Sequence, residues 1–331
     1  MLDNLRYFQP VGAPVMERVA VPDRDRVAAV VVTFNRWEIL FDAIKALLQQ
    51  SRPVDQIIVV DNNSSDGTAE KVEHMFPEVT CIRMVENTGP SGGFAVGMRR
   101  AVMDGADWVW VFNDDTTTTP DALEVCLAAA EGLVVEKAGV VCPYNRSGDY
   151  VEAGFFWRGK PVKAPLRAPT DEPYRVDLVT FNGALMSRRA LLQAGFPRDN
   201  YFLGFEEWEH CLRIVKSGFE IWMAPQVVVN HLHEGSNPGK TPPWRGYYQT
   251  RNQLAMAMEH RSPRAVFSWG VRQVKFLGAT VLHQDRKVER MVFRWRGTMD
   301  ALRGRMGRTV DPAAYAMKQA ARQAAVKEMA K

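Results

Sequence analysis

The chain has 331 residues, of which 46% are hydrophobic and 24% charged, and its net charge of +4 fits an ordinary globular protein with a sizeable core. Four widely separated cysteines without CxxC spacing exclude a cysteine-rich metal finger and favour reduced thiols in the cytoplasm: Cys81, Cys126, Cys142 and Cys211. No apolar run reaches the roughly 18 to 20 residues that span a bilayer, and residues 1–25 lack the apolar core of a signal peptide.

The first part of the chain alternates short apolar runs with segments of helical periodicity. Val27–Thr33 is continuously apolar, as in a strand covered on both faces, and apolar residues then recur at helical spacing from Trp37 to Gln50. Later runs predict strands at 56–60, 81–85 and 108–112, a helix from about 68, a Gly-rich loop at 87–93 and a helix over 95–103. The alternation predicts a doubly wound, mainly parallel α/β sheet, in which ligands bind at the carboxyl ends of the strands.

An acidic cluster, Asn113-Asp114-Asp115, follows the strand at 108–112. Adjacent carboxylates repel one another unless a positive charge lies beside them. A magnesium or manganese ion shared with a diphosphate would supply that charge, because hard oxygen ligands suit these metals. An Asx-rich turn before the next helix, with Thr119-Pro120-Asp121 as its cap, explains the same residues without a metal, and both interpretations can hold.

A second acidic cluster, Glu206, Glu207 and Glu209, opens a short helix that ends before Gly218. Acidic residues are common in the first turn of a helix, where the helix dipole favours negative charge. Glu207 and Glu209 are two residues apart and point in different directions. We therefore expect at most one of them to act as a catalytic base.

A third polar element is the strand that ends at His231 and His233. A histidine at a strand end is more often structural than metal-binding. Its combination with two acidic clusters favours a metal ligand here, and the sequence does not separate the two histidines. Between the clusters, residues 144–177 are rich in Pro, Gly and charge and predict an irregular or β-rich insertion.

Basic residues gather at the C-terminal end. From Arg261 onward there are 16 Lys or Arg and 5 Asp or Glu, which leaves 26 and 33 of the totals of 42 and 38 for the preceding part. Apolar residues recur at helical spacing among these charges, from Phe267 to Val281. The pattern favours peripheral docking on anionic lipid. A solvated helical face or an oligomer contact is the alternative, and no recognised module supports nucleic-acid binding.

At these residues the sequence resembles family 2 of the inverting glycosyltransferases, which have the A-type nucleotide-sugar-binding fold. The resemblance covers roughly 27–252 and rests on an ordered series of motifs: Thr33-Phe34-Asn35-Arg36, Asp61-Asn62, Asn87 to Phe94, the acidic cluster at 113–115, Phe181-Asn182-Gly183-Ala184, Glu206 to Glu209 and the strand-end histidine. The corresponding domains are an extension at 1–25, a catalytic domain at 26–260 and a basic helical region at 261–331.

Within that family the chain is similar to bacterial galactofuranosyltransferases and related rhamnosyltransferases, since Gly105 to Trp110 leads into the acidic cluster and Tyr247 to Asn252 follows the histidine. The resemblance implies transfer of galactofuranose from UDP-galactofuranose to a glycan acceptor linked to polyprenyl diphosphate, in cell-wall or surface-polysaccharide assembly at the cytoplasmic face of the membrane. A dTDP-rhamnose donor is the alternative. A non-catalytic nucleotide-sugar-binding protein on the same fold, and a nucleotidyltransferase, are further alternatives.

The resemblance also implies roles for individual residues. Thr33, Asn35, Arg36, Asp61 and Asn62 would hold the nucleoside, with Asn113 and Asp114 also contacting the nucleotide. Asp114, Asp115 and His231 would hold Mn²⁺ or Mg²⁺, Glu207 would be the catalytic base, and the substrate would meet Gly92, Gly93, Trp208, Glu209, Tyr248, Arg251 and Asn252. Asn113 departs from the third Asp that the galactofuranosyltransferases often have, which leaves one fewer charge for the metal. Glu207, the first of the two acids, likewise stands where the family more commonly has an Asp.

Overall fold

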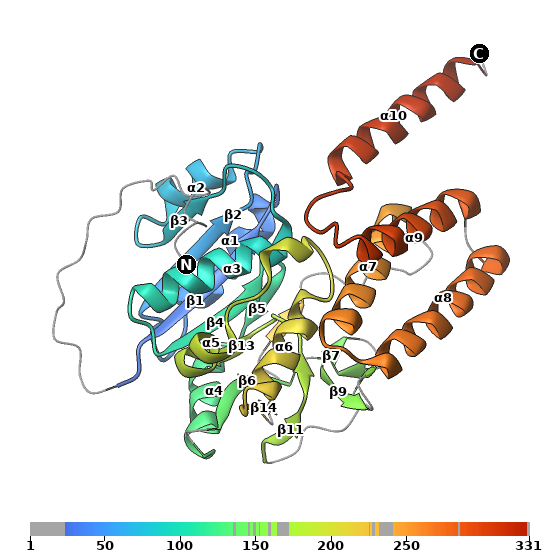
Figure 1. Ribbon diagram of the computed structural model, residues 1–331. Helices are drawn as coiled ribbons and strands as arrows, with labels where there is room; N and C mark the ends of the chain where they lie inside the picture. Colours follow the sequence, from blue (N-terminus) through green and yellow to red (C-terminus); the bar gives the residue numbers. More distant parts are fainter. Residues whose placement is uncertain are drawn as a thin grey trace. The chain divides into compact units, whose positions relative to one another are not determined.

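The computed structural model (Figure 1) describes residues 24–134, 137–144, 146–147, 150–151, 153–157, 160–163, 172–224, 226, 229–231, 241–283 and 285–329. For 146–147, 150–151, 155–157, 160–163, 230–231, 283 and 322–329 it describes the backbone only. Most of the expected N-terminal extension, 1–23, lies outside the described residues, as does His233.

Contacts divide the chain into two compact units, of which the first is Met1–Asp199 with Glu206–Gly235 and the second is Asn200–Phe205 with Ser236–Lys331. The helix at 243–259 therefore belongs with the C-terminal helices, although the sequence interpretation placed the domain boundary at 260/261.

The first unit is built on an eight-stranded sheet with the order β11-β14-β6-β13-β4-β1-β2-β3. Its strands are β1 (Val27–Thr33), β2 (Gln56–Asp61), β3 (Thr80–Arg83), β4 (Trp108–Asn113), β6 (Ala138–Cys142), β11 (Tyr174–Val176), β13 (Ala184–Ser187) and β14 (Glu220–Met223). The neighbours from β4 to β3 are parallel, as are β6 and β14, whereas β13 is antiparallel to both β4 and β6 and β11 is antiparallel to β14. The prediction of a mainly parallel sheet is confirmed.

Both faces of the sheet are covered, as the continuous apolar run of β1 predicts. Val27, Ala29 and Val31 pack in a core with α1 (Trp37–Leu48), α2 (Thr68–Met75) and α4 (Ala122–Glu131). Ala28, Val30 and Val32 pack in the core on the other face with α3 (Gly89–Met103), α5 (Arg188–Ala194) and α6 (Glu206–Lys216). Burial of each valine side chain contributes roughly 1.5 to 3 kcal/mol of hydrophobic free energy.

Helix α3 begins at Gly89, so the expected Gly-rich loop over 87–93 is largely helical. The physical reason is close packing. A Cβ on Gly93 would lie 2.6 Å from Val32 Cγ1 and 3.1 Å from Asn62 Nδ2, and a Cβ on Gly97 would also collide with β1. The glycines therefore let the helix approach the sheet.

The insertion between β6 and β11 is β-rich, as expected. It contains β7 (Arg146–Ser147), β8 (Tyr150–Val151), β9 (Ala153–Trp157) and β10 (Lys160–Lys163). Strand β9 pairs with β10 and with β12 (Leu178–Val179), and β7 pairs with β8. Near the acidic cluster, β5 (Thr116–Thr118) pairs with β15 (Val229–His231).

The second unit is helical and contains α7 (Pro243–Glu259), α8 (Pro263–His283), α9 (Lys287–Leu302) and α10 (Pro312–Met329). A small core holds Phe202, Tyr247, Tyr248 and Val310. Helices α7 and α9 pack closely at Gly297, where a Cβ would lie 2.5 Å from the carbonyl oxygen of Tyr247. In the part of the chain that the structure describes, no helix is long and apolar enough to cross a membrane.

Candidate active site

The acidic cluster lies at the carboxyl end of β4, beside the end of β1. Asp114 Oδ1 accepts a hydrogen bond from Arg36 Nη1 at 2.7 Å, and Asp114 Oδ2 accepts one from Thr33 Oγ1 at 2.9 Å. Arg36 Nη2 also lies 3.2 Å from Asp115 Oδ2. One guanidinium therefore bridges both carboxylates. The positive charge that the sequence argument assigned to a metal alone is supplied here by Arg36.

Burial controls the acidity of Asp114, whose side chain is 5% exposed. Loss of solvation raises the pKa of this carboxyl to about 6, although Arg36 and the hydroxyl of Thr33 act in the opposite direction and Asp115 adds to the increase. A further cation beside Asp114 would therefore stabilise the ionised form of its carboxyl.

The residues present fit a divalent cation by their chemistry. Asp114 and Asp115 offer the hard oxygen ligands that Mg²⁺ and Mn²⁺ prefer. The backbone of His231 pairs with Thr116, next along the chain from Asp115, so β15 brings the predicted third ligand to this edge. The His231 side chain lies outside the described residues, and among those described no three His, Cys, Asp or Glu side chains form a metal-binding group.

Asn113 and Asn182 connect the acidic cluster to the Phe181–Ala184 segment. Asn113 Nδ2 donates to Asn182 Oδ1 at 2.6 Å, and Thr116 Oγ1 donates to the same oxygen at 3.2 Å. Trp110 Nε1 donates to the Gly183 carbonyl at 2.9 Å. Asn182 was named within a sequence motif, but no role was predicted for it. The Asn-Gly pair was a signal for a turn, and Gly183 indeed has φ 85°.

Glu207 lies beside the same segment, because its Oε1 accepts a hydrogen bond from the Phe181 amide at 2.9 Å. Glu209 points elsewhere: it is buried, and Arg213 Nε and Arg198 Nε lie 2.8 and 3.2 Å from its Oε1. The expected divergence of the two side chains is confirmed. Only Glu207 is brought toward the acidic cluster through Phe181 and Asn182.

Two of the predicted substrate residues have structural contacts in this unit. Glu209, through Arg213, helps to hold the segment before α6, since Arg213 Nη2 donates to the Phe196 carbonyl at 2.8 Å. Trp208 is partly buried against the core on the α3 side of the sheet. Their contact with a substrate stays a prediction.

The predicted nucleoside residues organise the loops at the ends of β1 and β2. Asp61 is fully buried and accepts hydrogen bonds from the Ser64 amide, and burial raises the pKa of Asp61. Asn62 Oδ1 accepts from Thr88 Oγ1 at 3.1 Å and so ties β2 to the start of α3. Asn35 has φ 53°, and its Oδ1 accepts from the Ser65 amide at 2.7 Å. These bonds shape the rim of the site, and contact with a nucleoside stays a prediction.

The predicted acceptor residues lie in the second unit, where they hold a loop. Arg251 and Asn252 are fully buried, and Nη2 of the former and Nδ2 of the latter both donate to the Tyr201 carbonyl at 2.9 Å. Asn252 Nδ2 also donates to Gly204 O at 2.7 Å. Tyr248 Oη donates to Val310 O at 2.6 Å. Their contact with an acceptor stays a prediction.

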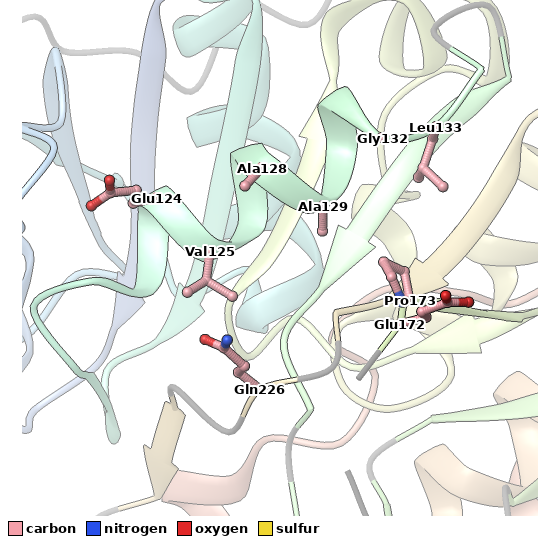
Figure 2. Close-up of a pocket in the computed structure, with 9 residues that line it drawn as sticks. All are labelled: Glu124, Val125, Ala128, Ala129, Gly132, Leu133, Glu172, Pro173 and Gln226. Carbon is pink, nitrogen blue, oxygen red and sulfur yellow. The ribbon is translucent and has the colours of Figure 1, made fainter. Parts of the chain in front are cut away.

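A groove of about 540 Å³ lies elsewhere in the first unit, along α4 (Figure 2). Val125, Ala128 and Ala129 line it opposite Pro173 and Gln226, with Glu124 and Glu172 near its ends. None of the predicted site residues contributes to this lining. The predicted nucleotide and metal residues lie instead at the carboxyl ends of β1, β2 and β4.

Similarity to known proteins shows the family of the chain. Residues 28–192 match the family described as Glycosyl transferase family 2, and the chain belongs to this family through that domain. A relative is the galactofuranosyltransferase GlfT1 of Mycolicibacterium smegmatis, 33% identical over 204 residues, which are 58% of this chain and 66% of the relative. A second is the N-acetylglucosaminyl-diphospho-decaprenol L-rhamnosyltransferase of Mycobacterium tuberculosis, 26% identical over 66% of this chain and 79% of the relative.

Solved structures show that the fold is the A-type glycosyltransferase fold. The S. aureus TarS 1-349 structure in complex with UDP-GlcNAc matches 83% of this chain and 81% of its own, with a TM-score of 0.56 and 15% identity. The mannosyltransferase PcManGT from Pyrobaculum calidifontis, in complex with GDP-Man and Mn²⁺, matches 91% of this chain and 81% of its own, with a TM-score of 0.51 and 16% identity.

Proposed function

We propose that the chain is an inverting, metal-dependent glycosyltransferase that transfers galactofuranose from UDP-galactofuranose to a lipid-linked glycan in cell-wall or surface-polysaccharide assembly. The observation that carries the proposal is the connection of Glu207, through Phe181 and Asn182, to the acidic cluster at the end of β4. This arrangement puts a candidate base and a candidate diphosphate site at one edge of the sheet.

Glu207 acts in this proposal as the general base. Its carboxylate takes the proton of an acceptor hydroxyl as that oxygen attacks the anomeric carbon from the face opposite the leaving diphosphate, so the configuration inverts. The Phe181 amide donates a hydrogen bond to one carboxylate oxygen and so holds the side chain in place. Asn113 and Asn182 offer neutral polar groups beside the reacting sugar and diphosphate.

The leaving diphosphate is placed at Asp114 and Asp115. These residues and His231 would hold the divalent cation, which when bound neutralises charge on the diphosphate. Arg36 already bridges the two carboxylates and can turn its guanidinium to phosphate oxygens, because guanidinium binds carboxylate and phosphate in the same fork geometry. PcManGT, which was solved with GDP-Man and Mn²⁺, supports metal use on this fold.

The relatives support the choice of donor and acceptor. The mycobacterial relative at 33% identity is a galactofuranosyltransferase, which favours galactofuranose, and the second relative acts on an N-acetylglucosaminyl-diphospho-decaprenol, which favours a polyprenyl-diphosphate acceptor. That second relative is matched over 79% of its length, so transfer of rhamnose from dTDP-rhamnose is the second candidate function. We place the chain at the cytoplasmic face of the membrane, as a peripheral protein, because such acceptors are membrane-bound.

The test of this proposal is Glu207→Gln. Glutamine keeps an oxygen that can accept from the Phe181 amide but cannot take a proton, so kcat for sugar transfer should fall by about 10² to 10⁴. Donor affinity should stay within about twofold, because the base contacts the acceptor. Transfer at more than a tenth of the wild-type rate would overturn the assignment of the base.

A further inference from the structure

A groove of about 230 Å³ is lined by α8 and α9 of the second unit. These two helices lie side by side and contact one another (Figure 1). Trp269, Gln273 and Leu277 line it from α8, and Arg294 and Trp295 line it from α9. Its lining therefore combines a guanidinium and an amide with large apolar side chains.

The guanidinium of Arg294 has only neutral partners among the contacts that the structure describes. Its Nη1 donates to Thr250 Oγ1 at 3.3 Å and to Gln273 Oε1 at 3.4 Å, and it stacks 3.9 Å from the centre of the Phe276 ring. Burial lowers the pKa of Arg294 to about 10, and the positive charge of Arg290 adds to the decrease. A partly buried cation with no acidic partner is stabilised by an anion that enters beside it.

Exposed apolar side chains continue from the groove along the outer faces of both helices. Leu277 and Trp295, which line the groove, are 49% and 66% exposed. On α8 the stripe extends to Val274 and Leu282, each 72% exposed, and on α9 to Val292. Large exposed apolar side chains on two neighbouring helices favour a partner that covers them, and a tryptophan beside a cation is typical of a membrane interface.

The surroundings of the groove favour a negatively charged partner. The chain from Arg261 onward contains 16 Lys or Arg and 5 Asp or Glu. Arg264 and Lys275 are exposed on α8, and Arg303 is exposed at the end of α9. Each basic residue near an anionic membrane surface strengthens binding by about fivefold. The complementary ligand is an amphiphile that has an anionic head and an apolar tail.

We propose that the groove between α8 and α9 binds the phosphate headgroup of an anionic membrane lipid. The phosphate oxygens accept hydrogen bonds from Arg294, and the lipid chain lies against Leu277 and Trp295. This inference rests on the proposed function in one respect, which is that a transferase acting on a lipid-linked acceptor works at a membrane. The groove gives that membrane contact a defined site.

The experiment is flotation of the full chain with vesicles of phosphatidylcholine, with and without phosphatidylglycerol. Wild type should float only with the anionic vesicles. Arg294→Gln should weaken this binding by at least tenfold, because a charge-assisted hydrogen bond is worth about 1.5 to 3 kcal/mol. The matched control is Arg303→Gln, which removes the same charge just after the end of the same helix, outside the groove, and should cost no more than about fivefold. Equal losses in the two variants would mean diffuse attraction and would overturn the site.

A second variant protects the test against misfolding. Leu277→Gln changes an exposed side chain and keeps every charge, so it should fold as wild type by circular dichroism and still bind the anionic vesicles several-fold more weakly. Undiminished binding by a folded Leu277→Gln variant would exclude an apolar contact at the groove.

Two further measurements distinguish a lipid headgroup from free phosphate, and the groove proposal from the proposed transferase function. Soluble dihexanoyl-phosphatidylglycerol should displace the protein from vesicles, whereas inorganic phosphate at equal ionic strength should not; equal displacement would mean a free-anion site and overturn the lipid proposal. Donor hydrolysis by wild type is measured on the same preparation. Lipid binding without hydrolysis would contradict the proposed function alone, and hydrolysis without lipid binding would contradict the groove alone. Size-exclusion chromatography could instead show a dimer that does not float with vesicles. Self-association that buries the groove would then explain its apolar lining and overturn the lipid proposal.

Discussion

Asp114 is a buried carboxyl whose charge is costly to the fold. Its pKa is raised from 3.8 to about 6, so the folded protein binds this proton more tightly than the unfolded chain does. The ionised carboxyl therefore lowers the free energy of unfolding, by an amount that is absent below about pH 4, grows between about pH 4 and 6, and is complete above that range.

Asp114→Asn should consequently stabilise the metal-free protein at pH 7.5, on the order of 1 to 3 kcal/mol, because a neutral amide of the same shape replaces the buried charge. The advantage should vanish near pH 4. Urea unfolding in the presence of a chelator measures both values. A variant less stable than wild type at pH 7.5 would mean that the Arg36 ion pair outweighs the cost of burial.

The same residue provides a test of metal binding. Mn²⁺ should raise the melting temperature of wild type in proportion to the logarithm of its concentration above the dissociation constant, since the ion binds the folded state. Asp114→Asn and Asp115→Ala should lose most of this shift, and Asp121→Asn, outside the cluster on the same segment, should keep it. A shift of equal size in all four proteins would place the ion elsewhere.

At the scale of elements, the contact between α3 and the sheet depends on glycine. A Cβ at Gly93 would meet Val32 and Asn62, so Gly93→Ala should lower the free energy of unfolding by about 1 to 3 kcal/mol despite the better helix propensity of alanine. The matched control is Gly270→Ala in the middle of α8, where a Cβ meets nothing within 4 Å and where we expect a gain of about 0.5 to 1 kcal/mol. Chemical unfolding of both variants gives the two signs. Loss of stability in both would argue that helix packing is not the cause.

Several elements could be predicted from the sequence because their signals are local. The apolar runs at β1, β2 and β4 and the acidic first turn of α6 are each visible within about ten residues. The start of α3 was misplaced because Gly92 and Gly93 read as loop residues, whereas their reason is the approach to Val32 across the sheet. Close packing between distant segments leaves no local pattern in one sequence.

The site was predictable in its residue types and less so in its partners. The adjacent carboxylates predicted a nearby cation. The sequence did not reveal that Arg36, 78 residues before Asp114, contacts both of them. Arg251 and Asn252 were predicted to meet an acceptor, and nothing in the sequence indicated that Asn252 donates to three carbonyls of the 201–204 loop. Hydrogen-bond partners of this kind are distant in the sequence and meet only in the folded chain. Composition and periodicity therefore do not reveal them.

At the scale of the whole molecule, the two units divide the proposed work. In our proposal, the first unit holds the donor at the ends of β1, β2 and β4 and supplies Glu207 as the base. The second unit carries an amphipathic helical surface whose basic charge suits a membrane. The family 2 match at 28–192 covers strands β1, β2 and β4 and ends before Glu207.

The most direct test of the central claim is release of UDP by the purified full chain, measured with a panel of nucleotide sugars, a polyprenyl-diphosphate-linked acceptor, and Mn²⁺ or chelator. We predict that UDP-galactofuranose is consumed only with metal and acceptor, and that the Glu207→Gln variant, folded by circular dichroism, is nearly inactive. Turnover of dTDP-rhamnose in its place would keep the mechanism and change the donor. No turnover of any nucleotide sugar, with no metal-dependent binding of UDP, would contradict the account.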